Sequence, residues 1–138
     1  MTGYTDEPVE ILADDECWRL AAGGQVARLA VAVGGEPDIY PITAATRDGA
    51  VVFRTAEGTK LLSLVINERV AVEFDGVEDG SAWSVVLKGT ARRLETSAEI
   101  EAAEGLALTP QIATVKSTYV EVAPTHVSGR RFRLAGED

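Results

Sequence analysis

Two-residue turn signals between short runs of β-branched residues constrain this fold most. Gly34-Gly35 and Asp48-Gly49 separate three runs that we predict to be strands, at Val26–Val33, Asp38–Ala45 and Ala50–Thr55. Such pairs supply the positive φ angles that tight hairpin turns require, and hairpins join antiparallel neighbours. The sequence therefore predicts an antiparallel sheet rather than parallel strands joined by helical crossovers.

Further along the chain, alternating apolar residues predict three more strands. They are expected at Arg69–Asp75, at Ala82–Glu95, and at Ser117–Leu134 as one bent strand or two short ones. Gly89, inside the second of these, indicates a bulge or sharp bend. A polar, acidic loop with the character of a solvated turn is expected between them at Gly76–Gly80.

Three short helices complete the expected elements. Apolar spacing and terminal signals place two of them at 14–22 and 59–67, and the capping-box spacing of Thr96 and Glu99 starts a third that ends near Gly105. The chain has no internal repeat or linker, so we expect residues 1–138 to form a single domain, with 1–12 loosely ordered. The predicted fold class is mostly β (α+β), a six-stranded small antiparallel barrel with about three short helices.

The charge balance restricts the partners. With 22 acidic and 13 basic residues the net charge is −9, which repels nucleic acid and acidic membrane surfaces. The first residues lack a signal-peptide pattern, and the lone Cys17 forms no internal disulfide. We therefore expect a cytoplasmic protein with no membrane or nucleic-acid partner.

Motifs for acid–base, nucleophilic or metal chemistry are not visible in the sequence. The single histidine, His126, and the single cysteine have no nucleophile motif around them, and the carboxylates are scattered. The glycine patterns of nucleotide P-loops and Rossmann folds are missing too. We predict no catalytic side chain and no metal ligand, and we expect His126 at the surface or in an interface.

The segment from Phe53 to Lys60 carries the strongest local signal. Arg54, Thr55, Thr59 and Lys60 place two cations and two hydroxyl groups around a strand-to-helix turn, and Gly58 allows close approach of the backbone. A helix N-terminus adds free N–H groups and partial positive charge. From the residues alone two interpretations stay open: a phosphate site, or a capped helix start with exposed cations.

The order of elements and three segments together resemble the pyridoxamine 5′-phosphate oxidase-like flavin-binding split barrels. The most specific segments are Pro37–Ile42, Val52–Lys60 and Trp83–Gly89, and the similarity extends from Asp14 to Phe132. The resemblance implies a six-stranded split barrel that forms a homodimer, with two cofactor sites at the subunit interface.

By matching position, the resemblance also implies roles for single residues. The backbone of Tyr40, Pro41, Ile42 and Thr43 would face the isoalloxazine ring; Phe53, Arg54 and Thr55 would line the ribityl chain; Thr59 and Lys60, beside Gly58, would hold the phosphate; Trp83 and Ser84 would approach from the partner chain. In such proteins the cofactor carries the redox chemistry, which accounts for the missing acid–base residues.

The expected function is that of a flavin-dependent oxidoreductase that binds FMN and a small-molecule substrate. Alternatives are a deazaflavin-dependent reductase of the same fold and a non-catalytic protein that binds a flavin or a haem-derived ligand. The family's true oxidases carry basic and histidine residues near the C-terminus, whereas this chain ends soon after Arg130-Arg131-Phe132-Arg133. Vitamin B6 is therefore not the expected substrate.

Overall fold

Seven strands and three helices make up the described part of the chain. A computed structural model describes residues 9–22, 26–56, 60–66, 68–109 and 117–135. The elements are β1 (Val9–Ile11), α1 (Asp14–Ala22), β2 (Val26–Val33), β3 (Glu36–Arg47), β4 (Ala50–Ala56), α2 (Lys60–Val65), β5 (Arg69–Glu78), β6 (Ser81–Arg93), α3 (Ser97–Glu104) and β7 (Ser117–Arg133). The mostly β fold with three helices is confirmed.

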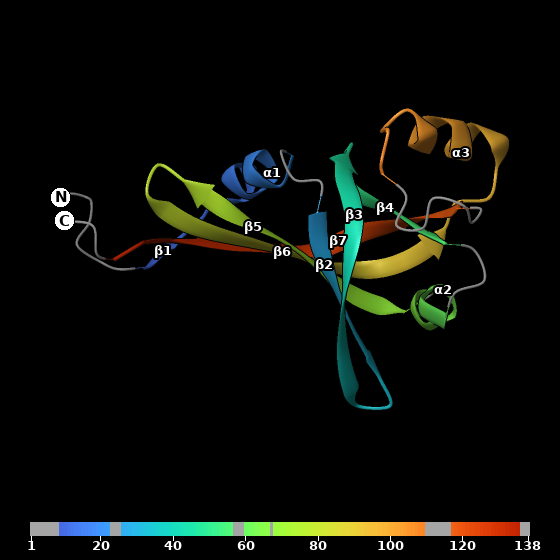
Figure 1. Ribbon diagram of the computed structural model, residues 1–138, viewed down its shortest axis with the longest axis horizontal. Helices are drawn as coiled ribbons and strands as arrows, with labels where there is room; N and C mark the ends of the chain where they lie inside the picture. The colour runs from blue at the N-terminus through green and yellow to red at the C-terminus, as the bar shows by residue number, and fades with distance from the viewer. Residues whose placement is uncertain (1–8, 23–25, 57–59, 67, 110–116, 136–138) are drawn as a thin grey trace.

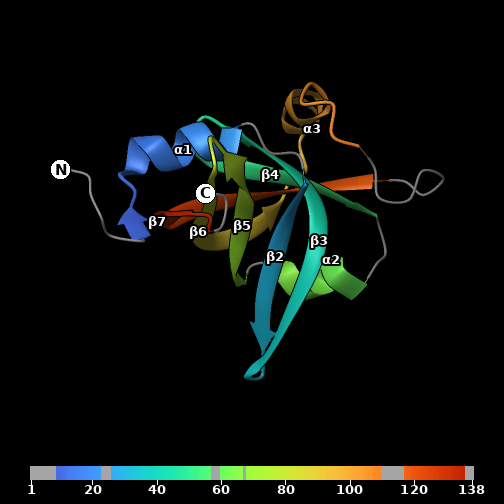
Figure 2. The same cartoon turned by 60° about the vertical axis from the view of Figure 1, so that its left-hand side comes forward.

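Six of the strands close into a ring. The sheet order is β1-β7-β4-β3-β2-β5-β6, and a further pairing of β7 with β6 closes it; every pairing is antiparallel. The β2–β3 hairpin projects away from this ring, and β5, β6 and β7 continue beyond its other side as a ribbon that β1 joins (Figures 1 and 2). The ring gives the sheet an inward, apolar face and an outward face.

Two predicted hairpin turns are confirmed. Gly34 and Gly35 have φ angles of 60° and 82°, and Asp48 and Gly49 have φ angles of 51° and 76°. Positive φ at both central residues is the geometry that matches the twist of the flanking strands.

The predicted loop at Gly76–Gly80 is wrong. β5 continues to Glu78, and only Asp79 and Gly80, with φ angles of 53° and 78°, form a turn before β6. Gly76 lies opposite Trp83 in the ladder, and its Cα faces the indole ring so closely that an added Cβ would lie 3.0 Å from it. The polar residues at 76–78 therefore belong to a strand, in which Gly76 pairs with Trp83.

The first and last strands, β1 and β7, differ from the predicted elements. Residues 9–11, inside the stretch expected to be loosely ordered, form β1 and pair with β7 from Phe132 to Arg130, so the sheet has seven strands instead of six. β7 is one strand of 17 residues. The expected irregularity at Gly89 is present as a register shift, and a Cβ there would lie 2.1 Å from the carbonyl oxygen of Ala123. Only glycine fits this approach of two backbones.

The apolar residues form two clusters on opposite sides of the sheet. The larger one fills the ring and is covered by Cys17, Leu20 and Ala21 of α1 and by Leu62 and Val65 of α2. The smaller one lies on the outward face, beneath α3. The capping box of α3 is present, with the Glu99 N–H donating to Thr96 Oγ1 at 3.1 Å. No helix among the described residues is long and apolar enough to cross a membrane.

Candidate functional site

The predicted site residues of β3 and β4 divide between the two faces of the sheet. Ile42, Phe53 and Thr55 point inward and are 1%, 0% and 1% exposed. Pro41, Thr43 and Arg54 lie on the outward face, because side chains alternate along a strand and Thr43 stands directly opposite Arg54. Of the strand residues, these three present side chains to the outside. Tyr40 points inward and packs against the edge of the main core.

Arg54 is held in one orientation by neutral groups. Its Nε donates to Ser117 Oγ at 2.7 Å, its Nη1 donates to the carbonyl oxygen of Leu108 at 2.7 Å, and its guanidinium carbon lies 5.6 Å from the centre of the Tyr119 ring. Tyr119 is directly opposite Arg54 in the β4–β7 ladder. Among the described residues no carboxylate forms an ion pair with Arg54.

Thr43 uses its hydroxyl group in the same way. Its Oγ1 donates to the carbonyl oxygen of Thr109 at 2.7 Å, one residue after the carbonyl that Arg54 holds. The segment after α3 is thereby fastened to the outward face of β3 and β4, with Leu108 buried in the smaller apolar cluster. A pocket of about 280 Å³ lies next to Arg54 and is bounded by Arg93, Ile100, Glu104 and Tyr119.

The turn between β4 and α2 is only partly described. Gly58 and Thr59, two of the predicted phosphate residues, lie outside the described residues, and so does the side chain of Lys60. Lys60 is the first residue of α2, which lies inside the helix predicted at 59–67. Of the four predicted cation and hydroxyl residues Arg54, Thr55, Thr59 and Lys60, the side chains of Arg54 and Thr55 are therefore the two that the structure describes.

Trp83 and Ser84 follow each other on β6 and lie on opposite faces. Trp83 packs against the main core and Gly76, whereas Ser84 points outward and donates to Glu73 Oε2 at 2.9 Å. Ser84, unlike Trp83, therefore presents its side chain on the outward face of the sheet.

A polar cluster that the sequence analysis did not identify lies around Ser84. Arg28 stands opposite Pro41 on β3 and opposite Glu73 on β5, and its Nη1 lies 2.9 Å from Asp75 Oδ2. Asp75, the last residue of the predicted strand, lies inside β5, which continues to Glu78. The alternation of β5 already placed Glu73 on the polar side, but only the strand order reveals Arg28 as its neighbour.

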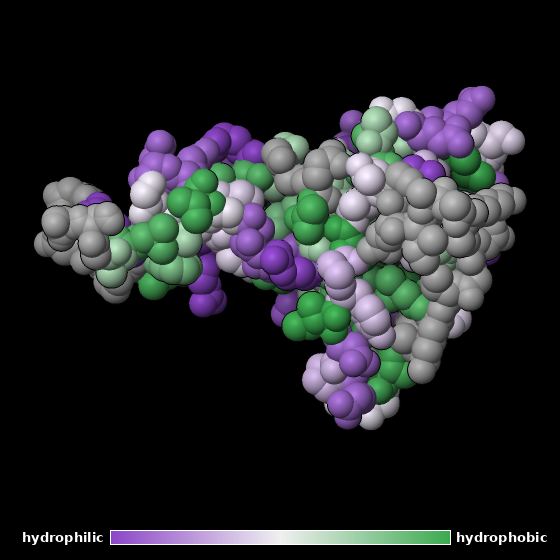
Figure 3. Space-filling model, viewed as in Figure 1, coloured by the Kyte–Doolittle hydropathy of each residue, from purple (hydrophilic) through white to green (hydrophobic). Residues whose placement is uncertain are grey.

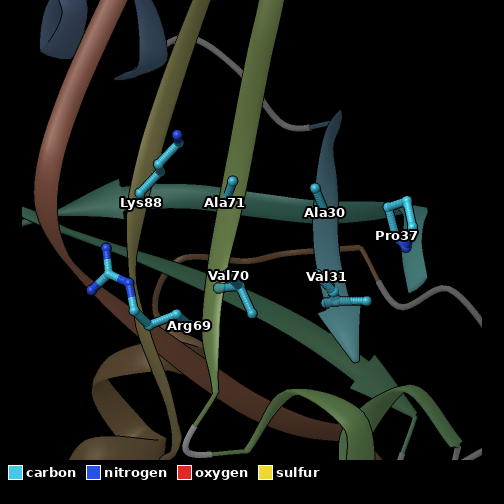
Figure 4. A pocket seen from close by; sticks show the side chains of 8 residues that line it. Ala30, Val31, Pro37, Arg69, Val70, Ala71 and Lys88 are labelled. Atoms are coloured by element: carbon cyan, nitrogen blue, oxygen red, sulfur yellow. The ribbon is translucent and has the colours of Figure 1, made fainter. Parts of the chain in front are cut away.

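An alanine-floored groove continues the same face. Figure 4 shows Lys88, Ala71, Ala30 and Pro37 in a row across β6, β5, β2 and β3, with Arg69 beside them. The groove has a volume of about 300 Å³. Small side chains here leave the backbone of several strands close to whatever covers the face.

Ion pairs among other charged residues hold α1 against the sheet. Hydrogen bonds from Arg19 and then Arg131 hold the pKa of Glu16 at about 2, and Arg19 also reaches Glu78 at 2.9 Å. These ion pairs fasten α1 to β5 and β7. His126 is exposed, as predicted, and Cys17 is fully buried beside Gly129.

Taken together, the outward face presents the guanidinium of Arg54, which neutral groups hold in place, and the stretch of β3 around Pro41. Residues 36–42 of β3 pair with β2 alone, so the other edge of this stretch is outside the ladders of the described strands. Backbone groups at such an edge can bond to a ring with several heteroatoms. A phosphate attached to a planar ring fits both features.

The chain is similar to known proteins in sequence and in fold. Residues 13–131 match the model of the pyridoxamine 5′-phosphate oxidase family. A FAD-binding protein of Mycobacterium smegmatis is 39% identical, with a TM-score of 0.82 over 91% of this chain and 100% of that one. A candidate pyridoxamine 5′-phosphate oxidase of Corynebacterium glutamicum is 40% identical, with a TM-score of 0.85 over 96% and 99% of the two chains.

Relatives without a known function are similar as well. A protein of Mycobacterium tuberculosis described as uncharacterised is 44% identical over 87 residues, which are 63% of this chain and 79% of the relative. The family match covers most of the chain, including β2 to β6 and the candidate site. The chain belongs to the pyridoxamine 5′-phosphate oxidase family.

Proposed function

We propose that this protein is a flavin-dependent oxidoreductase that binds a flavin nucleotide on the outward face of β3 and β4. The observation that carries the proposal is the guanidinium of Arg54 on β4, which Ser117, Leu108 and Tyr119 hold in one orientation. An arginine pre-oriented by neutral acceptors binds phosphate oxygens without first giving up an ion pair. Two of its five N–H groups take part in the hydrogen bonds to Ser117 and Leu108.

The residues present fit a flavin nucleotide. Arg54, with Thr59 and Lys60 at the turn, would hold the phosphate, and the backbone of Tyr40 to Thr43 would face the ring. The bound flavin would supply the electron-accepting and electron-donating chemistry. The side chains of Ile42, Phe53 and Thr55 support the site from the core, because they are buried.

A second copy of the chain would complete the site. Val77, Ala82, Phe132 and Val9 stand directly opposite one another across β5, β6, β7 and β1 and form an outward row next to Ser84. Three of them are 67% (Val77), 41% (Phe132) and 42% (Val9) exposed. Hydrophobic surface also gathers at this end of the ribbon in Figure 3. Such a row of exposed apolar residues fits a subunit interface, and we propose a homodimer.

The identity of the flavin is tested by spectroscopy and titration. FAD is favoured among the ligands because a relative with 39% identity is a FAD-binding protein; FMN and a deazaflavin are the alternatives. We expect the purified protein to show flavin absorbance, or the apoprotein to bind FAD or FMN with a change in tryptophan fluorescence. Failure to bind any of the three would refute the proposal.

Two controls separate binding from catalysis and from assembly. Reduction of the bound flavin by a nicotinamide donor supports the oxidoreductase, whereas tight binding without reduction by any donor favours a non-catalytic flavin carrier. Phe132→Asp should convert a dimer to a monomer in sedimentation experiments. Leu134→Asp, outside the row, is the matched control.

A further inference from the structure

The pocket of about 280 Å³ beside Arg54 lies on the far side of this arginine from β3. Thr43, Arg54 and Tyr119 stand directly opposite one another on β3, β4 and β7. The strand proposed to face the flavin ring, the strand that carries Arg54 and the strand that borders the pocket are therefore consecutive in the sheet. A ligand that extends from the ring to the phosphate is directed towards this pocket.

Four elements build the walls of the pocket. Arg54 comes from β4, Arg93 from the end of β6, Tyr119 from β7, and Ile100 and Glu104 from α3. Ile100 and Tyr119 also pack in the smaller apolar cluster, so they present an apolar wall. Arg93 and Glu104 are exposed and give the rim a cation and a carboxylate.

A nucleoside that is joined to the flavin phosphate through a second phosphate fits this combination. The apolar wall suits the flat base, and Arg93 is a second cation for a second phosphate. The carboxylate of Glu104 is an acceptor for the ribose hydroxyl groups. A volume of about 280 Å³ is near the lower end of the range for small-molecule sites, which suits one nucleoside.

We propose that this pocket binds the adenylate half of FAD, so that the protein selects FAD over FMN. FMN ends at the phosphate that Arg54 is proposed to hold, and it would leave the pocket empty. FAD continues beyond this phosphate and would gain the contacts with Arg93, Glu104 and the apolar wall. This role rests on the proposed flavin binding.

A substitution at the rim of the pocket separates the two flavins. Glu104→Trp fills the pocket with an indole ring from an exposed position, so it removes the space for the adenylate and keeps Arg54 for the phosphate. The affinity for FAD should fall by at least roughly tenfold, whereas the affinity for FMN should stay within about twofold of the wild type. Glu101→Trp is the matched control, because Glu101 is exposed on the same helix and does not line the pocket.

Isothermal titration calorimetry measures these affinities. Dissociation constants for FAD and for FMN are determined with the wild type, Glu104→Trp and Glu101→Trp. ADP is titrated into the same three apoproteins, because it carries the adenosine and both phosphates without the flavin ring. Binding of ADP to the wild type and to Glu101→Trp, but not to Glu104→Trp, is the expected result.

Each outcome decides a separate point. A preference for FAD in the wild type and Glu101→Trp that is lost in Glu104→Trp supports the proposal. Equal affinities for the two flavins in the wild type overturn it, and so does a preference for FAD that persists in Glu104→Trp. Equal losses of FAD and FMN in Glu104→Trp also overturn it, since they would place the shared phosphate in the pocket. If no flavin binds, the proposed function fails, and the titration with ADP alone decides whether the pocket takes an adenine nucleotide.

Discussion

Arg54 and Arg28 extend from the same outward face but have opposite surroundings. Arg54 is held by a hydroxyl group, a carbonyl oxygen and an aromatic ring, none of which carries a charge. Arg28 lies between two carboxyl groups, one of them 2.9 Å away. The charge of an arginine therefore does not define an anion site; the charge of its partners does. Among the described residues no carboxylate balances the charge of Arg54, whereas Asp75 and Glu73 balance that of Arg28 within the sheet.

The largest expected effect separates these two arginines directly. Arg54→Ala removes a charge-assisted phosphate contact worth about 1.5–3 kcal/mol, so flavin affinity should fall roughly ten- to a hundredfold. Arg28→Ala removes one unit of charge but no phosphate contact, so flavin affinity should fall less than in Arg54→Ala. Fluorescence titration of both variants with the same flavin measures the contrast.

Equal losses in the two variants would break the comparison, since they would place the phosphate between the two arginines.

Lys60→Ala tests the comparison at a second cation. If the turn into α2 holds the phosphate together with Arg54, this variant should also lose roughly ten- to a hundredfold in affinity. Unchanged affinity would remove Lys60 from the site and leave Arg54 to bind the phosphate without it.

The segment after α3, which contacts Arg54 and Thr43, should depend on the N-cap of α3 for its stability. Thr96→Ala removes the N-cap that accepts from Glu99 N–H, at a cost of about 1 kcal/mol in unfolding free energy. The ion pairs of Arg28 join β2 to β5, so the losses of stability in Thr96→Ala and Arg28→Ala should add in the double variant. Urea unfolding of the two single variants and the double variant checks both expectations; losses that do not add would show that the regions are coupled.

A smaller and opposite effect is expected in the Arg28 region. Because the pKa of Glu73 is raised in the folded protein, its stabilising contribution is complete at acid pH and is lost as pH rises through the folded value. Glu73→Gln should therefore be more stable than the wild type at pH 8, by about 1 kcal/mol, and not at pH 4. Urea unfolding at both pH values measures this difference, and equal stabilities at pH 8 would contradict it.

The sequence predicted the Arg54 region better than the Arg28 region, for a physical reason. Arg54, Gly58, Thr59 and Lys60 are neighbours in sequence, so a local pattern reveals their turn. Arg28, Glu73 and Ser84 come from three strands and meet only through the ladder. Their contacts depend on register, which hydrophobic alternation determines for one strand at a time.

The errors in the predicted elements have the same origin. Polar residues at 76–80 suggested a loop, but Gly76 and Val77 are paired with Trp83 and Ala82 across the ladder. The short strand β1 exists because β7 offers it an edge. Turn pairs and capping boxes act within a few residues and were predicted correctly. The division of site residues between core and surface also followed from strand alternation once the outward face was known.

The finest test concerns what keeps Arg54 ready to bind. Ser117→Ala removes the acceptor of its Nε but leaves Leu108 and Tyr119 in place, so the guanidinium should gain freedom without losing charge. A net hydrogen bond of this kind is worth about 0.5–1.5 kcal/mol, which predicts a flavin affinity roughly two- to tenfold lower. Ser63→Ala, on the exposed side of α2, is the control for fluorescence titration. If Ser117→Ala binds flavin as tightly as the wild type, the carbonyl of Leu108 and the Tyr119 ring are sufficient to orient the guanidinium.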